Sequence, residues 1–195
     1  MAASTDAPSG ARTHLPGELG VWVFILGDML MFAAFFVVFV YYRRQDVPLF
    51  VHSQSALNQH FGAINTLLML TSSWFVALAI HSARAHAKKF CSRFFSLALL
   101  CGLGFVLIKF FEYREKIRAG IMLTTNDFYM YYYMFTGLHL MHVLIGMGVL
   151  AYLMSIARAG DFQAKNITIL ESGASFWHMV DILWIVLFAL LYLMK

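Results

Sequence analysis

The sequence predicts an all-α, polytopic membrane protein built as a bundle of five transmembrane helices. Of its 195 residues, 61% are hydrophobic and only 12% are charged, whereas a soluble domain carries about 25% charged residues. The 19 Phe and 12 Met residues supply more apolar side chain than a water-surrounded core of this size can enclose. The remainder must face lipid, which excludes an ordinary soluble domain.

Five apolar stretches of about 20 residues are each long enough to cross a hydrocarbon core of about 30 Å as a helix. Backbone polar groups inside lipid must be hydrogen-bonded within the protein, and helices achieve this. We therefore expect a polar amino-terminal tail at residues 1–18 and a membrane domain at residues 19–195. Its helices are expected at about 20–42, 62–83, 94–113, 128–156 and 173–194, joined by short polar links.

The first predicted helix, residues 20–42, contains a single ionisable side chain, Asp28. An ionisable group inside a membrane costs several kcal/mol unless it is paired or solvated. Asp28 is therefore expected either to hold a proton or to find a partner on another helix. Two interpretations stay open: a packing carboxylate that is protonated or hydrogen-bonded, and a group that exchanges protons.

The second predicted helix contains small polar residues that allow helices to approach closely and to form interhelical hydrogen bonds. We expect Asn65, Thr66, Ser72 and Ser73 to serve helix packing in this way.

The third predicted helix carries charges near its end. Lys109 and Glu112 are three residues apart, and Lys116 follows four residues after Glu112. These spacings permit ion pairing along the helix and snorkelling of the lysines to the membrane surface. We therefore expect these residues to anchor the helix at the membrane boundary.

Two pairs of polar residues lie on single faces of the fourth and fifth helices: His139 with His142, and His178 with Asp181. Residues three apart share a helix face, so the two faces could meet. Three imidazoles and a carboxylate could then bind a metal. The same spacing also suits a metal-free hydrogen-bond network, which is our expectation.

Aromatic residues are frequent in these two helices. Because Tyr and Trp are enriched at membrane–water interfaces, we expect Tyr129–Tyr133, Trp177, Trp184 and Tyr192 to lie at the interface or to face lipid.

Basic residues in short loops prefer the cytoplasmic side of a membrane. The Lys and Arg residues are divided almost evenly between the two sides. Their densest cluster, between Arg84 and Arg93, favours an amino terminus inside the cell and a carboxyl terminus outside.

Four motifs in this order resemble the haem-copper oxidase subunit III family. They are I-N-T-L-L-M-L-T-S-S at Ile64–Ser73, F-F-E-Y at Phe110–Tyr113, F-T-G-L-H-L-M-H-V-L-I-G at Phe135–Gly146 and F-W-H-M-V-D-I-L-W at Phe176–Trp184. The chain looks like the five-helix bacterial form, and Asp28 lies where mitochondrial members carry a membrane Glu. The opening at Leu15–Met29 is similar to the branch associated with nitric oxide reductase gene clusters.

The resemblance implies a non-catalytic subunit that lies against the catalytic subunit I of a haem-copper terminal oxidase or a nitric oxide reductase. Such a subunit stabilises subunit I and supports respiratory electron transfer and proton uptake, with Asp28 as the candidate proton-linked carboxylate. It has no haem or metal of its own, and it binds phospholipid in a V-shaped cleft. The implied polar network around the cleft consists of Glu112, His139, His142, His178 and Asp181.

The resemblance further implies a bacterial inner membrane, with the amino terminus in the cytoplasm and the carboxyl terminus in the periplasm. No nucleic-acid partner is expected. Two alternatives stay open. One is an independent membrane protein that binds a metal or haem through the His/Asp cluster, and the other is a small ion-coupled transporter with Asp28 as its coupling carboxylate. The lack of an internal sequence repeat argues against the transporter.

Overall fold

Helices account for nearly all of the chain that the computed structural model describes, which is residues 18–160 and 162–194. Apart from Glu18, the predicted polar tail lies outside the described residues, as does Lys195. The described part contains no strand, and the all-α prediction is confirmed. The helices are α1 (Leu19–Gln45), α2 (Val47–Ser55), α3 (Gln59–Arg84), α4 (Lys88–Arg118), α5 (Asp127–Ala159) and α6 (Ala164–Phe188), which continues as the π-helical turn η1 (Ala189–Leu193).

Five of these helices are long and apolar enough to cross a membrane: α1, α3, α4, α5, and α6 together with η1. The shortest has 26 residues. At about 1.5 Å per residue it exceeds the hydrocarbon thickness of about 30 Å, so the helix ends extend into the polar headgroup region. The prediction of five transmembrane helices is confirmed, and the chain is a multi-pass membrane protein.

The link between the first two spans is more ordered than the predicted polar segment, because it contains the short helix α2. The Asp46 side chain caps this helix by accepting a hydrogen bond from the backbone of Leu49, and Pro48 lies in its first turn. Both features favour a helix start. Phe50 of α2 is buried, with its ring 5.6 Å from that of Phe39 on α1. The segment is polar overall, so the sequence did not indicate that Phe50 packs it against the bundle.

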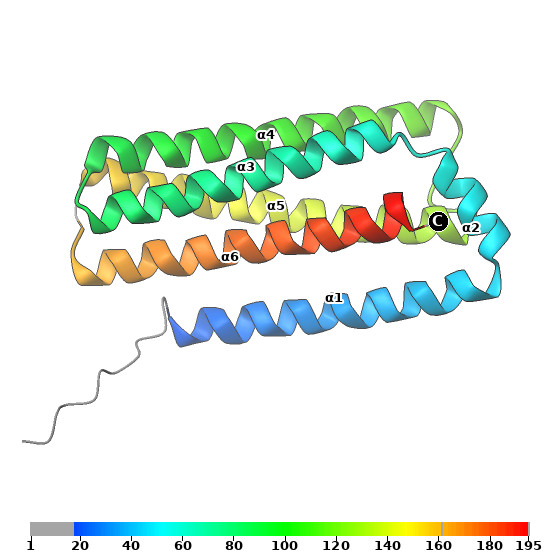
Figure 1. Ribbon diagram of the computed structural model, residues 1–195, viewed down its shortest axis with the longest axis horizontal. Helices are drawn as coiled ribbons and strands as arrows, with labels where there is room; N and C mark the ends of the chain where they lie inside the picture. The colour runs from blue at the N-terminus through cyan, green and yellow to red at the C-terminus, as the bar shows by residue number, and fades with distance from the viewer. Residues whose placement is uncertain (1–17, 161, 195) are drawn as a thin grey trace, which may run out of the picture.

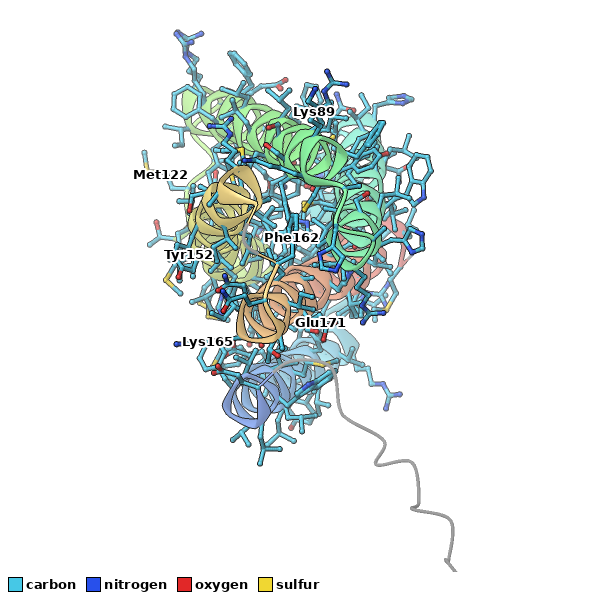
Figure 2. The ribbon with its side chains drawn as sticks, turned by 90° about the vertical axis from the view of Figure 1, so that its left-hand side faces the viewer. Lys89, Met122, Tyr152, Phe162, Lys165 and Glu171 are labelled. Atoms are coloured by element: carbon cyan, nitrogen blue, oxygen red, sulfur yellow. The ribbon has the colours of Figure 1, made fainter. Side chains whose placement is uncertain are left out.

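Four of the spans, α3 to α6, pack side by side as an antiparallel bundle, and α1 lies outside this group along α6 (Figure 1). The end-on view shows the same arrangement, with α1 outside the other four helices and next to α6 (Figure 2). Aromatic residues of α1, such as Phe39, also contact α5. The connection between α5 and α6 begins at a glycine. Gly160 ends α5 with a φ of 77°, a backbone conformation that favours glycine.

A close contact between α5 and α6 gives a first prediction. A Cβ atom on Gly146 would lie 2.7 Å from Cε3 of the buried Trp177 ring. We expect Gly146→Ala to overpack this contact and lower the free energy of unfolding by about 1–3 kcal/mol, measured by thermal unfolding in detergent. Gly148 is the matched control, because a Cβ atom there would meet nothing within 4 Å. Equal stability of the Gly146→Ala and Gly148→Ala variants would contradict this account of the packing.

Candidate functional site

Asp28, the carboxylate singled out in the first span, faces His142 of α5. Its Oδ2 atom lies 3.3 Å from His142 Nε2. On the other side of the ring, His142 Nδ1 lies 2.8 Å from the Leu138 carbonyl oxygen. A carbonyl only accepts hydrogen bonds, so Nδ1 must carry a proton. The other ring nitrogen, Nε2, is therefore the one that faces the Asp28 carboxyl group.

The surroundings of this Asp28–His142 pair are largely dry. The side chains of Asp28 and His142 are 14% and 7% exposed, and Phe32 packs its ring edge-to-face against the imidazole at 5.6 Å. The 3.3 Å contact is an ion-pair distance, not a formed hydrogen bond, and Asp28 Oδ2 has no hydrogen-bond partner elsewhere in the described chain. The Oδ2 atom of Asp28 therefore has His142 as its polar neighbour across the interface of α1 and α5.

A second cluster, which we call the Glu112 group, consists of Lys109, Glu112, Tyr132 and Tyr192. Lys109 Nζ donates to Glu112 Oε2 at 2.8 Å and to the Tyr192 hydroxyl at 3.0 Å. The hydroxyls of Tyr132 and Tyr192 donate to Glu112 Oε1 at 2.8 and 2.6 Å. The group therefore joins α4, α5 and η1 through a carboxylate whose two oxygens are both hydrogen-bonded.

The expectation that Lys109 snorkels to the membrane surface is wrong. Lys109 and Glu112 do pair, but their side chains are only 1% and 2% exposed. The ammonium group finds its partners inside the bundle, where it also lies 4.8 Å from the centre of the Trp184 ring. Its charge is balanced there by the carboxylate, so it has no need to reach water.

The aromatic residues were expected to lie at the interface or to face lipid, and most of them do not face lipid. Trp177, Trp184, Tyr132 and Tyr192 are fully buried. Residues without a side chain make room for two of them. A Cβ atom on Gly146 would collide with Trp177, and one on Gly62 would lie 3.1 Å from the ring of Tyr192. These aromatic side chains fill the bundle core. The hydroxyls of Tyr132 and Tyr192 are hydrogen-bonded in the Glu112 group, and the indole N–H of Trp184 donates to Thr66.

His139, one turn before His142 on α5, faces the centre of the bundle. It is fully buried, with its ring 5.6 Å from Phe105 and 5.3 Å from Trp184. Neither of its ring nitrogens has a hydrogen-bond partner in the described chain.

The residues predicted to pack helices join neighbouring helices in three of four cases. Thr66 accepts a hydrogen bond from Trp184 Nε1 on α6 at 3.1 Å. Ser72 donates to the Ala98 carbonyl on α4 at 2.9 Å. Ser73 is hydrogen-bonded to His178 on α6, and Asn65 is fully buried with its amide atoms unpartnered within the described chain.

Between α3 and α6, Ser73 contacts one of the two predicted polar residues of α6. Its hydroxyl is hydrogen-bonded to His178 Nδ1 at 2.5 Å, whereas Asp181 Oδ1 is buried without a hydrogen-bond partner in the described chain. His139, His142, His178 and Asp181 thus do not form one cluster. Among the described residues no three His, Cys, Asp or Glu side chains are placed to hold a metal ion. The metal-binding alternative requires these four side chains to converge, and they do not converge in the described residues.

An apolar groove of about 510 Å³ runs between α1, α5 and α6. Glu18 and Ser172 lie at one end of it, where the Glu18 backbone N–H donates to the Ser172 hydroxyl at 2.9 Å. Tyr152, labelled in Figure 2, contributes from α5. The other lining residues are Gly20, Val21, Phe24, Ile145, Val149, Leu153, Ile169, Gly173 and Phe176. None of the five residues predicted to surround a lipid cleft lines this groove; Glu112 and His178 line two smaller pockets.

Comparison with known proteins gives a consistent result. The family model described as Cytochrome c oxidase subunit III matches residues 12–195. The chain is 29% identical to cytochrome c oxidase subunit 3 of Alkalihalophilus pseudofirmus over 207 aligned positions, which cover 100% of this chain and 98% of the relative. It is 26% identical to cytochrome c oxidase subunit 3 of Bacillus sp. strain PS3, covering 90% and 84%. It is 27% identical to quinol oxidase subunit 3 of Bacillus subtilis, covering 90% and 86%.

Proposed function

The chain belongs to the cytochrome c oxidase subunit III family, the accessory membrane subunits of haem-copper oxidases, and we propose that it serves a bacterial respiratory oxidase in this role. The match of the family model to residues 12–195 carries the conclusion. Members of the family associate with the catalytic subunit I and have no redox cofactor of their own. We therefore assign electron transfer to the partner, and stabilisation of that partner to this chain.

The test is purification of the tagged chain from its native membrane in a mild detergent, followed by a haem spectrum and identification of the accompanying proteins. We expect a haem-bearing catalytic subunit to accompany the chain. Recovery of the chain alone and free of haem would overturn the proposal. A nitric oxide reductase as the partner is the second candidate, supported by the resemblance of Leu15–Met29. Reduction of nitric oxide but not oxygen by the purified complex would favour it.

We further propose that the amino terminus lies in the cytoplasm and the carboxyl terminus in the periplasm of the inner membrane. Support comes from the basic residues Arg84, Lys88, Lys89 and Arg93, which lie at the junction of α3 and α4 and thus at one end of the bundle. That end is expected to face the cytoplasm. A protease added to intact spheroplasts should remove a tag at the carboxyl terminus but leave one at the amino terminus.

Asp28 is proposed to take part in proton uptake by the complex. The support is its position 3.3 Å from His142 Nε2, where a carboxyl group and an imidazole face each other between α1 and α5. Asp28→Asn keeps a donor that can reach His142 Nε2 but can no longer bind or release a proton. We expect the assembled variant to lose activity during turnover at least about twice as fast as the native complex. A native rate of loss would contradict a role in proton transfer.

The groove between α1, α5 and α6 is proposed to hold a phospholipid acyl chain. Its size and its almost entirely apolar lining suit a hydrocarbon chain. Gly20 lines the groove and has open space around its α-carbon, whereas Gly27, on the same helix, has open space but lies outside the groove. We expect Gly20→Leu to lower the phospholipid retained by the purified complex, measured by mass spectrometry. Equal retention in Gly20→Leu and Gly27→Leu would argue against lipid binding here.

A further inference from the structure

Three fully buried side chains in the bundle core, Asn65, His139 and Trp177, have polar atoms with no partner among the described residues. Asn65 and His139 account for four of these atoms. The four atoms are Nδ2 and Oδ1 of Asn65 and both ring nitrogens of His139. A buried polar group left without a hydrogen bond costs about 1–3 kcal/mol. Within the hydrocarbon region no bulk water is at hand to reduce that cost. Water molecules bound beside Asn65 and His139 would remove that cost.

The two side chains lie in one layer of the bundle, which is organised around the indole of Trp184. Thr66, which follows Asn65 on α3, accepts the indole N–H. The ring of His139 lies 5.3 Å from the same indole, and Lys109 Nζ lies 4.8 Å from its centre. The helices α3, α4, α5 and α6 thus each contribute a polar or aromatic residue to this layer.

The layer adjoins the Glu112 group through Lys109. The ammonium group has three N–H donors, and two of them are used by Glu112 and Tyr192. The third is available to a water molecule. Glu112 also lines a pocket of about 100 Å³, together with Asn58 and Lys116. Water can thus approach the Glu112 group from the end of the bundle where α2 lies.

On its other side the layer adjoins the Asp28–His142 pair. His139 and His142 are three residues apart on α5, a spacing that places their Cβ atoms about 5–6 Å from each other. Both ring nitrogens of His142 already face other groups, the Leu138 carbonyl and Asp28 Oδ2, so the Asp28 carboxyl group is the end of the pair that water beside His139 would have to reach.

We propose that bound water molecules occupy the layer between Asn65 and His139 and link the Glu112 group to the Asp28–His142 pair by hydrogen bonds. Such waters satisfy the four unpartnered atoms, as buried waters do in polar cavities. Protons can then exchange between the Glu112 group and Asp28 through the interior of the bundle. The water site stands on the buried atoms alone, whereas the link to Asp28 rests on the proposed role of that residue.

The first test is a cryo-electron microscopy map of the complete complex in lipid nanodiscs, at a resolution that shows ordered water. We expect water density at hydrogen-bonding distance, about 3 Å, from a ring nitrogen of His139 and from the Asn65 amide. A dry layer would overturn the proposal. So would a direct hydrogen bond between Asn65 and His139.

The second test measures hydrogen–deuterium exchange of the Asp28 carboxyl group by infrared spectroscopy of the same complex, with Asp28→Asn identifying its band. The double variant Asn65→Leu, His139→Phe replaces both polar side chains by apolar ones. We expect it to slow the exchange by about tenfold or more. Ser72→Ala, which removes a hydrogen bond elsewhere on α3, should exchange at the native rate. Native exchange in the double variant would overturn the link to Asp28, even where the map shows the water and the catalytic subunit is retained.

Discussion

Replacing Lys109 with Met is expected to lower the free energy of unfolding by about 3–5 kcal/mol, because it leaves the Glu112 carboxylate buried without its counter-charge. In the native protein the ammonium group is 2.8 Å from Glu112 Oε2, and both side chains are almost fully buried. For a chain of this length the loss corresponds to a fall of about 6–20 °C in the unfolding midpoint. The measurement is thermal unfolding in detergent, followed by tryptophan fluorescence.

Lys89→Met is the matched control, because Lys89 lies on the same helix but is exposed to solvent. Its replacement should change the stability by no more than about 0.5 kcal/mol. The double variant Lys109→Met, Glu112→Leu removes both charges and should recover part of the loss. If Lys109→Met were as stable as Lys89→Met, the two buried groups would have to be uncharged in the native protein, and the ion-pair description of the Glu112 group would be wrong.

The spans themselves could be predicted from the sequence, because their length and hydropathy are local properties that lipid imposes on any helix. The depth of Lys109 could not. A spacing of three residues between Lys109 and Glu112 suits a pair at the membrane boundary and a pair inside the bundle equally well. The difference depends on the hydroxyls of Tyr132 and Tyr192, which are 20 and 80 residues from Glu112 in the sequence. Only the packing of α4 against α5 and η1 brings them to the carboxylate.

The partner of Asp28 was predictable in kind but not in identity. A carboxylate alone in an apolar span requires a proton or a partner, and the structure supplies His142. The sequence named no particular partner, and the last two spans contain three histidines, His139, His142 and His178. His142 lies on the face of α5 toward α1, whereas His178 is turned toward Ser73 on α3. Which histidine faces Asp28 depends on the rotation of each helix about its axis. Contacts between helices, such as that of Gly146 with Trp177, fix this rotation.

Trp184 is the residue whose truncation should have the second large effect. Its indole is fully buried and packs against Phe105, with ring centres 4.8 Å apart, and against His139. Trp184→Ala removes these contacts and leaves a cavity, so we expect a loss of about 3–5 kcal/mol in the free energy of unfolding. Denaturation in detergent, followed by circular dichroism, measures it without depending on the missing fluorophore.

Two comparisons separate packing from hydrogen bonding at this position. Trp184→Phe keeps an aromatic ring but loses the N–H that donates to Thr66, and we expect the lost hydrogen bond to contribute only about 0.5–1.5 kcal/mol. Trp74 is 61% exposed in the bundle, so Trp74→Ala should leave the core intact. The expected order of destabilisation is therefore Trp184→Ala, then Trp184→Phe, then Trp74→Ala. Equal effects of the two alanine variants would place Trp184 at the lipid-facing surface, as its residue type alone suggests, and would remove the centre from the polar layer inferred above.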